Sequence, residues 1–376
     1  MSSGNETVLQ FGAGRFLRAF VDRFIQNAND AGQDVGRVVV VQSTPGKRAD
    51  LLQHQPDGFH VLVRGYEDEK LIERVEKVQC ISRAISASSQ WDQVLLVAKS
   101  PDLKYVVSNA TESGYVLDPA DRIDSAPPQT LPGKLAQVLW QRFQSGTMPL
   151  TLLPTELIER NGDKLRDLVL TQADRWNLPG DFSAWVREQC LWLSSLVDCM
   201  VTNPPADHPL AATDALLQHA EPYALWAIEK PRQRPFAFIR HPAIQLVDDL
   251  APYFLRKVQI LNGIHTAIVG KFLPRGFTTV QQVLADRDAN RWVRDTIYEE
   301  IVPTLAYRLE HVAAFADQTC DRLRNPFIRH LLSDICFHHR DKVRIRLKPT
   351  YDEYAKLFGK PPVRIAEAML FEPSAE

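Results

Sequence analysis

The chain has 376 residues, of which 45% are hydrophobic and 24% charged, and its formal net charge is −2. This composition is ordinary for a soluble globular protein, and the length favours two domains over one. The near-neutral charge excludes the strong electrostatic attraction that nucleic-acid and membrane-surface binding proteins use, so we expect neither partner. No apolar run approaches the roughly 18 residues of a membrane helix, and residues 1–6 contain no apolar signal region, which favours a cytoplasmic protein.

The five cysteines are scattered and odd in number, and none stands in a CxxC pair or in a Cys/His spacing typical of a metal site. Unpaired, scattered cysteines are usual in reducing compartments. The sequence therefore predicts reduced thiols and no bound metal.

The chain begins with a short apolar strand at residues 7–11, followed by a Gly-Ala-Gly turn and a helical pattern over residues 16–24. Residues 37–41 are a dense β-branched run of the kind that forms a buried parallel strand. Strand, glycine turn, helix and strand together make a βαβ unit. The same alternation continues with strands at 59–64, 105–109, 150–153 and 196–201, and with helices that end near 97 or span 134–143 and 162–177.

Alternating strands and helices predict an α/β fold with a doubly wound sheet, so we expect a Rossmann-like dinucleotide-binding domain over residues 1–245. A second, all-helical domain that carries substrate and catalytic residues is expected over 246–376. Residues 231–242, with three prolines and a strand-like stretch at 236–239, mark the transition. The helical patterns of the second domain cover residues 250–272, 280–284, 289–315 and 327–338.

Gly12 and Gly14 lie between the first strand and the first helix, where dinucleotide-binding folds place a glycine-rich turn. Gly12 would permit the tight turn, and Gly14 would let a pyrophosphate approach the helix N-terminus, where Arg15 and Phe16 follow as further cofactor-binding candidates. Leu17 stands where the usual fingerprint has its third glycine, so an ordinary strand-to-helix turn is the alternative.

The second strand ends at Gln42 without the acidic residue that would bind the ribose hydroxyls of NAD. Gln42 takes that place as a cofactor-binding candidate. Lys47 and Arg48 could meet the 2′-phosphate of NADP, or they could begin a solvated helix. We expect NAD as the cofactor, with NADP as the alternative.

Asn109, Thr111 and Glu112 stand at and just after the end of the strand at 105–109. Polar residues at that point should lie near the nicotinamide ribose. A plain Asx or Ser/Thr turn is the alternative interpretation.

Residues 257–265 contain Lys257, Asn262 and His265 in an otherwise apolar stretch that is typical of one helix. At about 100° per residue, Asn262 lies about 140° from Lys257 and His265 about 80° from it, so one broad, half-buried side can present all three. Loss of hydration would lower the pKa of the lysine toward the range useful for proton transfer. Asn262 and His265 could donate hydrogen bonds to a substrate oxygen. A surface lysine with two ordinary core polar groups is the alternative, and a rise of roughly 12 Å between Lys257 and His265 strains the catalytic arrangement.

Four stretches carry a family resemblance: FGAGRFLRAF at residues 11–20, SNATESGY at 108–115, the helix at 257–265, and RLRNPF at 322–327. In this order, and across most of the chain, they resemble the polyol-specific long-chain dehydrogenases, also called the mannitol dehydrogenase family. Within that family the branch of tagaturonate reductases, or altronate oxidoreductases, is the most similar. The stretches similar to that branch are residues 154–162, 214–217, 220–223 and 225–229.

The resemblance implies a nicotinamide-dependent interconversion of a ketone and a secondary alcohol on an open-chain sugar derivative, without a metal. It implies that Lys257 is the general base in oxidation and the general acid in reduction. It implies that Asn262, His265 and Asn161 hold the reacting oxygen, and that Arg322 contacts the substrate.

A sugar-acid substrate also needs a cation for its carboxylate, and arginine offers the bidentate geometry. Arg322 and Arg324 are the favoured candidates, with a solvated helix face as their alternative role. His330, Lys342 and Arg346 are further candidates.

We therefore expect an NAD(P)-dependent oxidoreductase that interconverts a keto-sugar acid of the tagaturonate or fructuronate type and its alcohol, acting as a monomer or small homo-oligomer. One alternative is a polyol or polyol-phosphate dehydrogenase of the mannitol or arabinitol type, and another is a catalytically silent nucleotide-binding sensor. The chain departs from the family pattern in two ways, which affect the prediction of the substrate more than the prediction of the fold. They are a shorter chain and Cys199-Met200 where the family often has Arg-Ile.

Overall fold

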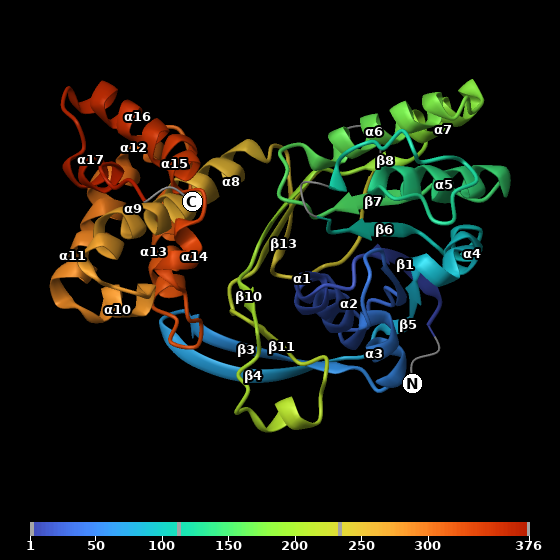
Figure 1. Cartoon of the computed structure of the whole chain (residues 1–376), viewed down its shortest axis with the longest axis horizontal. Coiled ribbons are helices and arrows are strands. Elements are labelled where there is room, and N and C mark those ends of the chain that lie inside the picture. The colour runs from blue at the N-terminus through green and yellow to red at the C-terminus, as the bar shows by residue number, and fades with distance from the viewer. Residues whose placement is uncertain (1–3, 111–113, 232–234, 374–376) are drawn as a thin grey trace. The chain divides into compact units, whose positions relative to one another are not determined.

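The computed structural model describes residues 4–110, 114–231 and 235–373, and within them the chain forms two compact units (Figure 1). We expected a division at 245/246, and the structure divides the chain between Leu250 and Ala251 instead. The helical unit also takes in two short segments that precede Leu250 in the sequence. Unit 1 comprises Met1–Val63, Arg74–Ala220 and Ala224–Leu250, and unit 2 comprises Arg64–Glu73, Glu221–Tyr223 and Ala251–Glu376.

Unit 1 is built on a six-stranded sheet with the strand order β5-β2-β1-β6-β7-β8, in which every neighbouring pair is parallel. The chain runs outward from β1 in both directions, so the order reverses between β1 and β6. Reversal at this point is the mark of a doubly wound fold, and the expected fold class is confirmed. The strands are β1 (Glu6–Phe11), β2 (Arg37–Gln42), β5 (Ile81–Ser86), β6 (Tyr105–Ser108), β7 (Thr151–Pro154) and β8 (Leu191–Trp192).

Helices cover both faces of this sheet. Successive residues of a strand point to opposite sides, so a strand that is apolar throughout has side chains to bury on each face. Val38 and Val40 pack into one core cluster, and Val39 and Val41 into the other. The first face is covered by α1 (Arg15–Ala19), α2 (Val21–Asp30) and α3 (Arg48–His54). The second is covered by α4 (Ala87–Ala98), α5 (Leu131–Gln144), α6 (Asn161–Arg175) and α7 (Gly180–Glu188).

Two smaller sheets complete the strand inventory. In one the order is β10-β11-β3-β4, and in the other it is β13-β12-β9. The stretch at 236–239, which we expected to be strand-like, is irregular in the structure, and the strand lies later, at Ile244–Val247 (β13). The remaining strands are β3 (Phe59–Glu67), β4 (Lys70–Val78), β9 (Ser195–Asp198), β10 (Val201–Thr202), β11 (Gln218–Ala220) and β12 (Leu225–Glu229).

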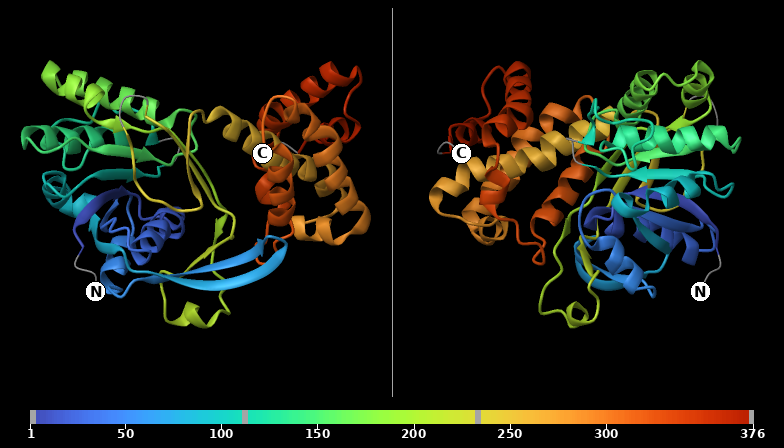
Figure 2. Two further views of the ribbon diagram at one scale, coloured as in Figure 1. Left: turned by 180° about the vertical axis from the view of Figure 1, so that it is seen from behind. Right: turned by 45° about the vertical axis from the view of Figure 1, so that its right-hand side comes forward.

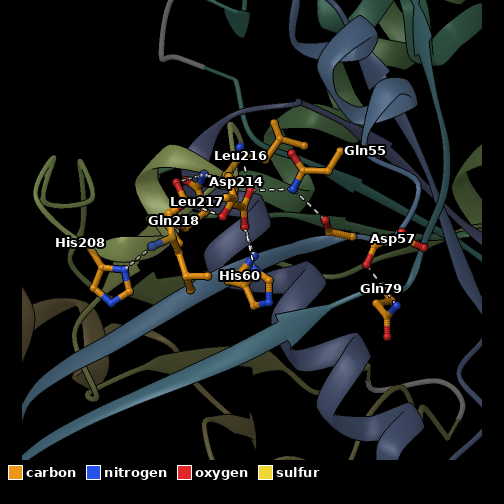
Figure 3. A network of polar contacts seen from close by, with 12 residues as sticks. Gln55, Asp57, His60, Gln79, His208, Asp214, Leu216, Leu217 and Gln218 are labelled. Atoms are coloured by element: carbon orange, nitrogen blue, oxygen red, sulfur yellow. Dashed lines mark hydrogen bonds and ion pairs between the residues drawn. The ribbon is translucent and has the colours of Figure 1, made fainter.

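The segment before β11 is fixed by the buried carboxylate of Asp214. It accepts hydrogen bonds from Gln55 Nε2 at 2.6 Å, from the backbone and ring nitrogens of His60 at 2.6 and 2.9 Å, and from Leu216 N at 2.9 Å. Figure 3 shows Asp214 in the middle of these partners. The carboxylate thus ties three separate pieces of unit 1 together, and we assign it a structural role.

Unit 2 is helical around a core of its own, as the two views of Figure 2 show. The helix expected over 289–315 is interrupted, because turns follow Ala306 and His311 takes a left-handed φ of 58°. The helix expected over 327–338 is reduced to Leu332–Cys336. The helices are α8 (Ala251–Arg256), η3 (Lys257–Asn262), α9 (Gly263–Phe272), η4 (Leu273–Arg275), α10 (Val280–Ala285), α11 (Arg287–Asp295), η5 (Thr296–Ile301), α12 (Pro303–Ala306), α13 (Val312–Leu323), α14 (Leu332–Cys336), α15 (His339–Lys342), η6 (Val343–Leu347), α16 (Lys348–Phe358) and α17 (Val363–Met369).

One carboxyl group in the core of unit 1 makes stability depend on pH. Asp22, on α2, is fully buried, and Gln10 Nε2 donates to its Oδ2 at 3.2 Å while Oδ1 has no hydrogen-bond partner among the described residues. Burial raises the pKa of Asp22 from 3.8 to about 7, against the smaller opposing effects of the Gln10 hydrogen bond and the Arg18 charge.

Between about pH 4 and pH 7 the folded chain therefore holds a proton that the unfolded chain has lost. The free energy of unfolding should fall across this window as the pH rises, by on the order of 4 kcal/mol, since each pKa unit is worth about 1.36 kcal/mol. Asp22→Asn should remove most of this fall, whereas Asp30→Asn at the exposed end of the same helix should keep it. Urea unfolding below and above the window measures the difference, and an unchanged pH dependence in Asp22→Asn would contradict the assignment.

Candidate functional site

The glycine turn lies at the carboxyl ends of β1 and β6, where the strand order reverses. Gly12 has a φ of 135°, and a Cβ atom there would lie 2.9 Å from Leu17 Cδ1 and 3.3 Å from the carbonyl oxygen of Asn109, so the position requires glycine. A Cβ atom at Gly14 would meet nothing within 4 Å. The backbone before α1 is therefore open to a ligand, and the turn fits the pyrophosphate of a dinucleotide.

The residues after the turn take different positions. Arg15 is exposed, and Phe16 is half-buried with its ring stacked 4.8 Å from that of Phe20. Leu17, which replaces the third glycine of the usual fingerprint, is buried in the core. Its side chain fills the space that a glycine would leave between helix and sheet. Arg15 and Phe16 stay candidates for cofactor contact.

The side-chain amide of Gln42 is hydrogen-bonded within the loop that follows β2. Its Nε2 donates to the carbonyl oxygens of Thr44 at 2.9 Å and Gly46 at 2.7 Å, and its Oε1 accepts from Ala49 N at 2.6 Å. The side chain is buried and holds the loop between β2 and α3. Gln42 thus supports this loop, and its contact with the cofactor stays a prediction.

Asn109 lies where we expected it, at the end of β6 beside the glycine turn. Its Nδ2 donates to the carbonyl oxygen and the hydroxyl of Thr155, at 3.1 and 3.0 Å, which joins the loops that follow β6 and β7. Thr111 and Glu112, the other candidates in this loop, lie outside the described residues.

Sequence reasoning missed Glu156, which follows β7 directly. It is buried, its Oε1 accepts from Ala110 N at 2.9 Å, and its Oε2 accepts from the hydroxyl of Tyr115 at 2.9 Å. Burial raises the pKa of this carboxyl, although the hydrogen bonds it accepts act in the opposite direction. Glu156 thus connects the residue after β7 to Ala110 and Tyr115. A carboxylate at the carboxyl end of a buried parallel strand was the signal available in the sequence.

Asn161, which the family resemblance placed at the reacting oxygen, is hydrogen-bonded to neighbouring loops within unit 1. Its Nδ2 donates to the carbonyl oxygens of Pro154, Glu156 and Ser195 at 3.2, 2.9 and 3.0 Å, and its Oδ1 accepts from Ser195 N at 2.9 Å. The residue is fully buried at the start of α6. Asn161 thus connects the loop after β7 to β9, and its expected contact with the reacting oxygen stays a prediction.

Lys257 and Asn262 are the first and last residues of η3, which is π-helical, and His265 follows in α9. Hydrogen bonds of the i→i+5 kind bring residues five apart to roughly one turn from each other. Lys257 and Asn262 therefore lie closer around the axis than the α-helical separation of about 140°. His265 is three residues beyond Asn262, a spacing that makes neighbours on an α-helix. The π-helical turn therefore brings the three side chains closer to one side of the helix than an ideal α-helix would.

His265 is buried, and its hydrogen bonding fixes its tautomer. Its Nδ1 lies 2.7 Å from the carbonyl oxygen of Leu261, which can only accept, so Nδ1 carries the proton. Burial lowers the pKa of His265 to about 3, with further lowering by the nearby His330 and Arg322, so the ring is neutral. Its Nε2 is buried without a hydrogen-bond partner in the described structure. We expected His265 to donate to a substrate oxygen, but Nε2 is instead an acceptor, suited to a substrate hydroxyl.

Arg322, a favoured candidate for contact with the substrate, forms a buried ion pair. Its Nε lies 3.1 Å from both carboxylate oxygens of Glu221, and its Nη2 lies 2.8 Å from Oε1. The guanidinium also lies 4.3 Å from the ring centroid of Tyr223. Both charged side chains are almost fully buried, so Arg322 holds the segment Glu221–Tyr223 in unit 2.

The rest of the RLRNPF motif holds the tip of the β3–β4 hairpin. Arg324 pairs with Asp321 at 2.7 Å and lies 3.9 Å from the ring centroid of Tyr66. Asn325 Nδ2 donates to the carbonyl oxygen of Arg64 at 3.0 Å. The guanidinium of Arg64 in turn lies 3.9 Å from the ring centroid of Phe327. The motif thus supports the hairpin tip in this structure, and the substrate contacts expected of Arg322 and Arg324 stay predictions.

A cavity of about 570 Å³ within unit 2 is lined by the hairpin tip, α11 and α13. Arg322 and Arg324 line it, whereas Lys257, Asn262 and His265 do not. Among residues 4–110, 114–231 and 235–373, no group of His, Cys, Asp and Glu side chains could hold a metal ion. None of the helices in the same ranges has the length and apolar character to cross a membrane.

Family models match both halves of the chain. The mannitol dehydrogenase Rossmann domain matches residues 6–236, and the mannitol dehydrogenase C-terminal domain matches residues 249–357. The altronate oxidoreductase of Bacillus subtilis is 36% identical over 96% of this chain and 77% of its own length. That of an Enterobacter species is 34% identical over 97% of this chain and 78% of its own length.

Two solved structures are similar in fold. A substrate-free D-sorbitol dehydrogenase has a TM-score of 0.82 at 20% identity, over 97% of this chain and 79% of its own. The mannitol 2-dehydrogenase of Pseudomonas fluorescens, solved as a ternary complex with NAD and D-mannitol, has a TM-score of 0.77 at 21% identity, over 98% of this chain and 79% of its own. The family resemblance expected from the four sequence stretches is confirmed.

Proposed function

The chain belongs to the mannitol dehydrogenase family, and on this premise we propose that it reduces a keto-sugar acid of the tagaturonate type to an alcohol of the altronate type, and catalyses the reverse oxidation. The observation that carries the proposal is the placement of Lys257, Asn262 and a neutral His265 along one helical stretch of unit 2. These are the groups that carbonyl reduction needs: a proton donor, an amide donor and an acceptor for a sugar hydroxyl.

Reduction of the ketone builds negative charge on its oxygen. We infer that the Lys257 ammonium donates the proton that turns this oxygen into a hydroxyl, and takes it back in oxidation. The Asn262 amide stabilises the developing charge as a second donor. His265 Nε2 accepts a hydrogen bond from a sugar hydroxyl and so orients the carbon that reacts.

NAD is the proposed cofactor, and the nicotinamide supplies the hydride when it is bound. Gly12 and the open backbone at Gly14 would hold the pyrophosphate, and Asn109 would lie beside the nicotinamide ribose. The solved mannitol 2-dehydrogenase of similar fold holds NAD, which supports the same choice here. Glu156 keeps the Asn109 loop in place through Ala110 and Tyr115.

The choice of a sugar acid over a polyol rests on sequence similarity. The altronate oxidoreductases are 34–36% identical to this chain over nearly all of it, whereas the two polyol dehydrogenases are 20–21% identical. The greater identity favours the substrate class in the name of the first group.

Oxidation of NADH by purified protein tests this choice with a matched substrate panel. Tagaturonate and fructuronate should be reduced at least about 10-fold more efficiently, in kcat/KM, than tagatose and fructose, since each 1.4 kcal/mol of differential binding is worth a factor of ten. Tagaturonate and fructuronate each carry a carboxylate that the matching ketose, tagatose or fructose, lacks, and the sugars are otherwise alike. Efficient reduction of fructose with no reduction of either keto-uronate would reject the sugar-acid function in favour of a polyol dehydrogenase.

A further inference from the structure

If the proposed function holds, the substrate brings a carboxylate into unit 2, and a cation should meet it. Three of the cations that the sequence offered are already engaged. Arg322 is paired with Glu221 in the core, and Arg324 is paired with Asp321 beside Tyr66. Lys342 Nζ donates to the carbonyl oxygen of Ile335 at 2.8 Å. His330 is neutral, because burial and the Arg322 charge lower its pKa. Arg346 is the candidate that stays available.

Arg346 belongs to η6, a second π-helical segment, which packs against η3 and α9. Its Nη1 lies 3.5 Å from the hydroxyl of Thr266, a long contact, and that hydroxyl donates to the carbonyl oxygen of Asn262 at 2.8 Å. Thr266 comes directly after His265 and one turn after Asn262. The guanidinium therefore lies against the same helix, at the level of the residues proposed to hold the reacting oxygen.

The surroundings of Arg346 leave most of its donors unused. The side chain is half-buried, and burial lowers its pKa, with no carboxylate counteracting the effect. In the described part of the chain no carboxylate pairs with it. By contrast Arg344, two residues earlier in η6, is exposed and pairs with Asp341 at 3.2 Å. A half-desolvated guanidinium without a counter-ion is favourable for binding an anion from outside, because the anion restores the charge balance.

We propose that Arg346 binds the carboxylate of the keto-sugar acid and so selects this substrate class over neutral ketoses. A guanidinium can bind a carboxylate through two parallel hydrogen bonds, which fixes the orientation of the acid end of the sugar. Asn262 and His265 then receive the carbonyl and hydroxyl part of the same chain of carbon atoms. This assignment rests on the proposed function and identifies the group that determines its specificity.

Arg346→Gln is the variant that tests the assignment. For tagaturonate its KM should rise about 10- to 100-fold, the loss expected for a charge-assisted hydrogen-bonded pair. For tagatose, which lacks the carboxylate, kcat/KM should change by less than about threefold, since no ionic contact is lost. Arg346→Lys should fall between wild type and Arg346→Gln, because it keeps the charge without the bidentate geometry. Arg344→Gln is the matched control in the same segment and should behave as wild type.

Different results would reject the role of Arg346 and the proposed function on which that role rests. Wild-type protein that reduces tagaturonate, together with an Arg346→Gln variant of unchanged KM, overturns the role of Arg346 and leaves the function standing. An equal loss for tagaturonate and tagatose overturns it too, because it shows a structural effect. Wild-type protein that reduces neutral ketoses but no keto-uronate rejects the function, and the assignment with it. Thermal unfolding of each variant shows whether the fold is kept.

Discussion

Lys257→Ala is expected to reduce kcat for keto-uronate reduction by about 10²- to 10⁴-fold, the usual contribution of a positioned general acid. The residue is half-buried at the start of η3, and no other lysine lies in the stretch from Lys257 to His265. NADH should still bind with near wild-type affinity, because the cofactor turn is in unit 1. Steady-state oxidation of NADH with tagaturonate gives kcat, and fluorescence titration gives the affinity for NADH.

Two controls test whether the loss of activity comes from the loss of the proton donor. Lys257→Arg keeps the positive charge but cannot release a proton near neutral pH, so it should be nearly as inactive as Lys257→Ala. A small primary amine added to Lys257→Ala should restore part of the activity, because it can occupy the empty space and transfer the proton. Full turnover in either variant would show that Lys257 does not transfer the proton.

Glu221→Ala is expected to destabilise the protein by about 3–5 kcal/mol, because it leaves the Arg322 guanidinium buried without its partner. The carboxylate and the guanidinium are 1% and 4% exposed, so water cannot replace the lost partner without opening the fold. This pair also holds the segment Glu221–Tyr223 in unit 2, although the residues on both sides of that segment belong to unit 1. Urea unfolding measures the loss.

A comparison of two ion pairs on the same helix tests the cause. Asp321→Asn removes the partner of Arg324, whose side chain is 41% exposed, and should cost less than about 1 kcal/mol. The double variant Glu221→Leu with Arg322→Met replaces the buried pair by apolar groups and should regain most of the stability. Equal losses of stability for Glu221→Ala and Asp321→Asn would show that the burial of the Glu221–Arg322 pair does not cause the loss.

The parallel sheet of unit 1 can be predicted from sequence because its strands are continuous apolar runs. Val38 to Val41 are all fully buried, two on each face, and no other arrangement buries four β-branched residues in a row so simply. The β3–β4 hairpin is harder to predict. β4 alternates exposed and partly buried residues, and this pattern predicts a half-exposed strand but does not identify the residues that it contacts. The tip of the hairpin is held by residues near 325, too far along the chain for a local pattern to reveal.

The residue types of the candidate site could be predicted, but their hydrogen bonding could not. Asn161 and Arg322 look like free polar groups in the sequence. In the structure they are hydrogen-bonded to partners such as Ser195, 34 residues away, and Glu221, 101 residues away. Arg346 gave no stronger signal than other arginines, since what distinguishes it is a missing counter-ion. The π-helical turn between Lys257 and Asn262 depends on packing, so a fixed angle per residue misplaces these two side chains.

We propose that this protein passes hydride between a nicotinamide and a keto-sugar acid while Lys257 transfers the proton. The most direct measurement incubates the protein with tagaturonate and NADH carrying deuterium at C4 of the ring, on each face in turn, and analyses the product by mass spectrometry. We predict altronate that carries one deuterium from one of the two labelled faces with wild-type protein, and almost none in the same time with Lys257→Ala. Unchanged tagaturonate in the wild-type reaction, or altronate without deuterium from either face, would contradict the account.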